Sequence, residues 1–115
     1  MEAAVKNLVI VANNSKSGAA ELAAEFAARA EAAGVATRVE SAYPIPEGIF
    51  KGVDACCVIG GDGTLLSVAA EAAREDTRVF GVNMGKLGFL AMFTVDEARA
   101  FFDQFLGGDF RISDR

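Results

Sequence analysis

The chain has 115 residues, of which 52% are apolar and 23% are charged, and its mean hydropathy is +0.30. This length fits one domain with a real core, and the composition excludes a disordered chain. The net charge of −5 without basic blocks argues against nucleic acid and anionic membranes as partners. No apolar run approaches the ~18 residues that span a bilayer, and the N-terminus lacks signal-peptide features, so we expect a cytoplasmic protein.

The first half of the chain predicts a strand, a helix and a second strand. Asn7–Ala12 is a short β-branched run of the kind buried on both faces of a parallel sheet. A polar loop, Asn13–Gly18, leads into helical periodicity over Ala19–Ala33, and Val35–Ser41 alternates like a strand. One helix face is predicted to be solvated and carries Glu21, Glu25 and Arg29.

The second half repeats this alternation. Ala55–Ile59 and Arg78–Asn83 are predicted strands, and Leu65–Arg74 between them has helical periodicity. A last helix is predicted to start at Thr94, because Glu97 three residues later completes a capping box. The last seven residues, 109–115, resemble the beginning of another strand.

Strands alternating with helices of this length predict a Rossmann-like, open parallel α/β sheet with helices on both faces, as one domain over residues 1–115. Ligands of such sheets bind beyond the carboxyl ends of the strands. Two glycine-rich segments follow predicted strands, one after Ile59 and one after Asn83. We therefore expect both segments to be functional.

The segment Gly60-Gly61-Asp62-Gly63-Thr64 suits phosphate binding. Glycines let the backbone approach a ligand closely, and the N-terminus of the following helix offers N–H donors. The lysine of a P-loop and the third glycine of a dinucleotide-binding loop are both missing. Asp62 could accept a proton from an attacking hydroxyl or help to organise Mg²⁺, but it could also simply cap the helix at Thr64 or Leu65.

Cys56 and Cys57 are adjacent within an apolar run. Neighbouring strand residues point to opposite faces, so both cysteines are predicted to be small core residues. A metal site at this pair lacks CxxC spacing, and the chain has no histidine. No metal-ligand set is therefore predicted.

Two segments together carry a family resemblance. Gly60–Leu66 (GGDGTLL) resembles the signature of the superfamily of NAD kinases, diacylglycerol and sphingosine kinases and, more distantly, 6-phosphofructokinases. Gly81–Ala91 (GVNMGKLGFLA) resembles the NAD kinase pattern, in which an Asn ends a strand and an N-x-G-x-L-G-F loop follows. Lipid kinases instead carry a loop with proline and threonine that leads to an Asn-Asp pair, which this sequence lacks.

The resemblance implies roles for matching positions. Asp62 would activate the 2′-hydroxyl of the NAD adenosine ribose. The nucleotide and donor phosphates would lie against Gly60, Gly61, Gly63 and Thr64. NAD would lie against Asp62, Gly63, Leu66, Ser67, Asn83 and Phe89.

Some positions keep alternatives. Phe89 could equally be an ordinary core aromatic. Ser67 stands where many NAD kinases have a basic residue, and Lys86 could supply a cation nearby. The loop Ser15–Gly18 is either a secondary phosphate contact or simply solvated.

The implied reaction is phosphoryl transfer from ATP or polyphosphate to NAD, giving NADP, with Mg²⁺ carried by ATP rather than by a visible protein motif. NAD kinases are two-domain proteins, generally oligomeric, whose β-rich C-terminal domain supplies most NAD contacts. That domain is not recognisable in this sequence, so the chain alone is expected to turn over little or no substrate, and a homo-oligomer is expected. The alternatives are a lipid kinase of the same superfamily and a non-catalytic nucleotide-binding module.

Overall fold

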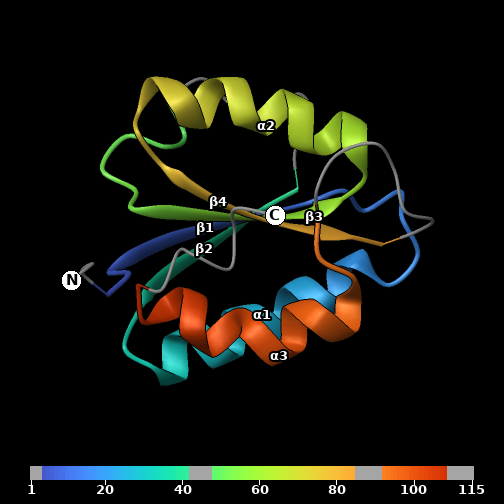
Figure 1. Cartoon of the computed structure of the whole chain (residues 1–115), viewed down its shortest axis with the longest axis horizontal. Helices are drawn as coiled ribbons and strands as arrows, with labels where there is room; N and C mark the ends of the chain where they lie inside the picture. The colour runs from blue at the N-terminus through green and yellow to red at the C-terminus, as the bar shows by residue number, and fades with distance from the viewer. Residues whose placement is uncertain (1–3, 42–47, 85–91, 109–115) are drawn as a thin grey trace.

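A computed structural model describes residues 4–41, 48–84 and 92–108 (Figure 1). The elements alternate along the chain as the sequence predicts. The strands are β1 (Asn7–Ala12), β2 (Ala36–Glu40), β3 (Ala55–Gly60) and β4 (Arg78–Asn83). The helices are α1 (Ala19–Ala32), α2 (Asp62–Arg74) and α3 (Val95–Leu106).

Within the described residues the strands form one parallel sheet in the order β2-β1-β3-β4. The chain leaves β1 toward one edge of the sheet and later leaves β3 toward the other edge. Right-handed crossovers in opposite directions place their helices on opposite faces. Accordingly α2 covers one face while α1 and α3 cover the other (Figure 1), which confirms the predicted α/β sheet with helices on both faces.

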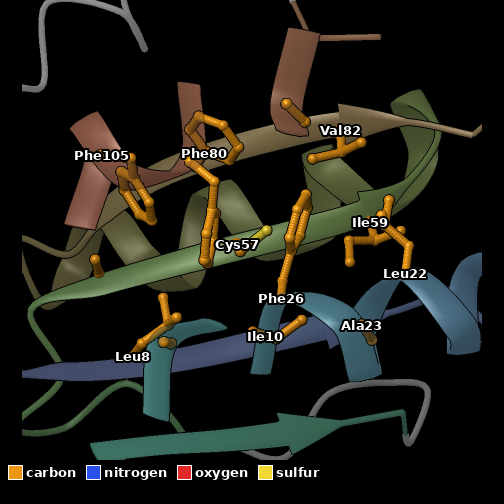
Figure 2. Packing of buried hydrophobic residues seen from close by; sticks show 14 of the residues in the cluster. Leu8, Ile10, Leu22, Ala23, Phe26, Cys57, Ile59, Phe80, Val82 and Phe105 are labelled. Atoms are coloured by element: carbon orange, nitrogen blue, oxygen red, sulfur yellow. The ribbon is translucent and has the colours of Figure 1, made fainter. Parts of the chain in front are cut away.

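The larger core lies between the sheet and the helix pair α1 and α3 (Figure 2). The rings of Phe26 and Phe102 stack with centroids 4.3 Å apart, which joins the two helices. Phe80 of β4 stacks on Phe105 of α3 at 4.7 Å. Burying a phenylalanine side chain contributes about 1.5–3 kcal/mol, so this aromatic cluster is a main anchor of α3.

The smaller core lies beneath α2. It is formed by Val9, Val11, Ile49, Phe50, Cys56, Val58, Val68 and Ala72. Cys56 belongs to this core, whereas Cys57 belongs to the larger core on the opposite face, as the alternation of a strand requires. Both thiols are free and fully buried, and burial raises the pKa of each, which confirms them as core residues.

The α1 face predicted to be solvated also borders α3. Glu21 is exposed, whereas Glu25 and Arg29 are partly covered and make ion pairs. Arg99 of α3 binds Glu25 at 3.0 Å, and Arg29 binds Asp103 of α3 at 3.0 Å. The Arg29 guanidinium also lies 5.1 Å from the centroid of the Phe102 ring. The periodicity of α1 alone could not predict this, because the partners lie more than seventy residues later in the chain.

Candidate functional site

The candidate site lies at the carboxyl ends of β1, β3 and β4, on the right of Figure 1. The chain leaves β1 and β3 in opposite directions, so these two neighbours form the topological switch point of the sheet. Asn13 N–H donates to the Ile59 carbonyl at 2.9 Å, and Met84 N–H donates to the Gly60 carbonyl at 2.9 Å. These bonds hold the three strand ends together where ligands of open α/β sheets bind.

The turn from β3 into α2 is tighter than the sequence indicated. β3 continues through Gly60, Gly61 is the extended N-cap residue, and α2 begins at Asp62 rather than at Leu65. Gly61 therefore occupies the N-cap position, and Asp62 follows it as the first helical residue. No side chain caps the helix at Gly61. A first turn without a side-chain cap leaves N–H groups for water or a ligand.

Asp62 occupies the first helical position and is partly buried. A carboxylate in the first turn is stabilised by the positive end of the helix dipole. Gly63 follows it, and a Cβ added there would meet no atom within 4 Å. The turn thus presents one acidic side chain beside open space.

Gly60 and Thr64 pack against each other inside the turn. A Cβ at Gly60 would lie 2.7 Å from Thr64 Oγ1 and 2.9 Å from Thr64 Cβ, so a larger residue does not fit without movement. Thr64 is only 5% exposed, and its hydroxyl accepts a hydrogen bond from Asn13 Nδ2 at 3.1 Å. In this structure both residues shape the turn, whatever further contact they make with a ligand.

The sequence did not single out Asn13. Its Oδ1 accepts from Ser15 N–H at 3.0 Å and from Ser15 Oγ at 2.6 Å, while its Nδ2 reaches Thr64 across the switch point. An Asn directly after a buried strand, with Ser two residues later, is the pattern of an Asx turn and could have identified this loop. The contact to Thr64 is fifty-one residues away in sequence and had no local signal.

The loop after β1 also brings Lys16 to the glycine turn. A Cβ at Gly61 would lie 3.8 Å from Lys16 Cε and 4.0 Å from Lys16 Nζ. The loop therefore borders the glycine turn, although its residues 14–17 are exposed.

The predicted NAD-contacting residues fall at several places. Leu66 is 61% exposed on α2, unusual for a leucine, and Ser67 is also exposed, with its hydroxyl donating to the Gly63 carbonyl at 3.0 Å. Asn83 is 6% exposed and ends β4, with its N–H donating to the Phe93 carbonyl at 2.8 Å. Phe89 and Lys86 lie outside the described residues.

The described ranges, 4–41, 48–84 and 92–108, also bear on a metal site and on a membrane span. No group of three or more His, Cys, Asp or Glu side chains there could hold a metal ion. In the same ranges, no helix combines the length and apolar character needed to cross a membrane.

Residues 44–110 match the family described as ATP-NAD kinase N-terminal domain. This segment starts in the connection before β3 and contains the glycine turn, β4 and α3. It spans more than half of the chain.

Curated relatives agree with this match. The NAD kinase of Campylobacter jejuni subsp. jejuni is 48% identical over 64 residues, which is 56% of this chain and 22% of that protein. The NAD kinase of Geobacter sulfurreducens is 41% identical over 71 residues, 62% of this chain and 25% of that protein. That of Syntrophotalea carbinolica is 46% identical over 63 residues, 55% and 22% of the two chains. The chain thus spans only about a fifth to a quarter of the length of these relatives.

Proposed function

Because the chain belongs to the NAD kinase family, whose N-terminal domain it matches, we propose that it forms the phosphoryl-transfer side of an enzyme that converts NAD to NADP. The observation that carries the proposal is the turn at the switch point. There, Asp62 opens α2 beside glycines, and the N-cap residue Gly61 has no side chain that could bond the first helical N–H groups. An enzyme that phosphorylates a hydroxyl group needs a carboxylate and a phosphate-binding turn next to each other.

In the proposed reaction the 2′-hydroxyl oxygen of the NAD adenosine ribose attacks the terminal phosphorus of the donor. The bond between that phosphorus and its bridging oxygen breaks, so ADP leaves when ATP is the donor. The hydroxyl proton passes to the carboxylate of Asp62. The glycine turn and the first N–H groups of α2 bind the donor phosphates and hold the reacting groups in line.

Mg²⁺ fits this arrangement as a companion of the donor rather than as a resident ion. The described residues supply no cluster of ligands, and Asp62 is the acidic side chain of the turn. Bound with the donor, Mg²⁺ would neutralise part of the phosphate charge. Polyphosphate remains a second candidate donor, because the turn recognises phosphate and not the base.

We also propose that a second, β-rich domain supplies the opposite wall of the cleft and that the assembly is a homo-oligomer. The proposal is supported by the small share of its relatives that the chain covers and by Leu66, an exposed apolar side chain beside the turn. On this view the contacts to NAD form only when both walls of the cleft are present, and they involve Leu66, Ser67, Asn83 and Phe89. The isolated chain is then expected to make little or no NADP.

The test is a chimera in which this chain replaces the corresponding N-terminal part of the Campylobacter jejuni NAD kinase. We expect it to form NADP from NAD and ATP, and Asp62→Asn to lower kcat by at least about a hundredfold, the usual contribution of a general base. Asp76→Asn is the matched control, because Asp76 is exposed beyond the far end of α2 with a φ of 55°, a conformation that Asn tolerates. A folded chimera in which Asp62→Asn keeps full activity would contradict the role of Asp62.

Two other functions are tested alongside. A lipid kinase would phosphorylate diacylglycerol or a sphingoid base in the same assay with no NADP formed. A non-catalytic module would bind nucleotide equally well after Asp62→Ala and would give no product in any chimera.

A further inference from the structure

Lys16 is a cation placed where two helices present their positive ends. It precedes the start of α1 by three residues, and its side chain lies beside Gly61, the N-cap of α2. Its ammonium makes no hydrogen bond or ion pair with any residue of the described ranges. A cation near a helix N-terminus is electrostatically unfavourable, and this loop has two such ends beside it. An anion bound between them would remove that conflict.

The loop that carries Lys16 is exposed, but hydrogen bonds fix its backbone. Lys16 N–H donates to the Asn13 carbonyl at 3.0 Å, and the Lys16 carbonyl accepts from Ala19 N–H at 3.1 Å. The Asn13 side chain ties the loop to Thr64 in the first turn of α2. The backbone of Lys16 is thus fixed relative to the glycine turn, and only its flexible side chain remains to be ordered on binding.

The glycines keep this approach open. A side chain at Gly61 would begin within 4.0 Å of the Lys16 ammonium and would fill the space between the loop and the turn. A phosphate group seated on the N–H groups of α2 would occupy this same region. The chain as a whole carries a net charge of −5, so a polyanion needs local cations of this kind.

We propose that Lys16 binds the phosphate chain of the donor across the switch point, together with the glycine turn of α2. The proposal rests on the proposed function for the identity of the donor. The loop after β1 would supply the positive charge that the glycine turn lacks. Lys16 would contact the triphosphate and not NAD. Asn13 and Thr64 are the positioning residues, because they fix the loop that carries it.

The experiment measures binding of inorganic tripolyphosphate and of ATP to the 115-residue chain by calorimetry. Lys16→Met should weaken both by roughly tenfold, the loss expected for one charged hydrogen bond. It should also flatten the dependence of binding on salt, because one charge contact is gone. Lys16→Arg should keep most of the affinity. Lys6→Met is the matched control, since Lys6 is exposed just before the other end of β1.

The outcomes separate this proposal from the proposed function. The role of Lys16 is overturned if the parent chain and Lys16→Met bind tripolyphosphate equally well and have the same urea midpoint. It is also overturned if the parent chain binds no tripolyphosphate. In the chimera with the Campylobacter jejuni enzyme, Lys16→Met should raise KM for the donor. The KM for NAD should stay within about twofold of the parent value. Lysine-dependent binding without NADP formation would support this site while contradicting the reaction.

Discussion

At the scale of single residues, two glycines of the same turn have opposite structural requirements. Gly60→Ala should lower the free energy of unfolding by about 1–3 kcal/mol, because the new methyl group would overlap the buried Thr64 side chain. Gly63→Ala should be neutral or raise it by up to about 1 kcal/mol, because a Cβ there meets nothing and alanine favours a helix. Urea denaturation of the two variants measures both effects.

A double variant identifies the cause at Gly60. If overlap with Thr64 destabilises Gly60→Ala, then Thr64→Ala, which removes the Oγ1 atom 2.7 Å from the new Cβ, should cost less stability in the Gly60→Ala chain than in the parent chain. Additive losses in the double variant would show that the strain lies elsewhere, for example against Asn13 Cβ at 3.2 Å.

At the scale of elements, the start of α3 has the most complete cap among the described helices. Thr94 Oγ1 accepts from Glu97 N–H at 3.1 Å, and Glu97 Oε1 accepts from Thr94 N–H at 3.0 Å. Thr94→Ala should therefore lower the free energy of unfolding by about 1 kcal/mol, whereas Thr94→Ser should change it by only a few tenths. A shift of the urea midpoint in Thr94→Ala no larger than that in Thr94→Ser would contradict the cap.

The difference between α3 and α2 explains how far the sequence could predict elements. The start of α3 is specified by two residues three positions apart, so the sequence predicts it correctly. The sequence predicts the start of α2 three residues late, because Gly61, Asp62 and Gly63 have poor helical propensity. The contacts from Asn13 to Thr64 and from α1 to α3 join residues distant in sequence, and nothing local indicates them.

The candidate site could likewise be predicted from the sequence only in part. That β3 and β4 end at one edge of the sheet could be predicted, because parallel strands end on the same side. The sequence did not establish which strands are neighbours, so the loop after β1 remained ambiguous. The order β2-β1-β3-β4 resolves this, because it makes β1 the direct neighbour of β3 and brings Lys16 to Gly61.

At the scale of the whole molecule, the two cysteines report on both faces of the sheet. Cys56 faces the core under α2, and Cys57 faces the core under α1 and α3. Burial raises the pKa of both thiols, so neither forms the reactive thiolate in the folded protein at about pH 8. As the pH rises above the unfolded-state value of about 8.5, the unfolded chain loses thiol protons that the native state retains, so stability should fall there.

These thiols test whether the domain unfolds as one unit. In single-cysteine variants, Cys56→Ala and Cys57→Ala, the remaining thiol should react with a chromogenic disulfide reagent only through global unfolding. Adding Thr94→Ala should then speed both reactions by roughly fivefold, the effect of about 1 kcal/mol on the unfolded population, although α3 covers only the Cys57 face. Faster labelling of Cys57 alone would mean that α3 detaches from the sheet by itself, because its aromatic contacts would then be weaker than the cohesion of the strands.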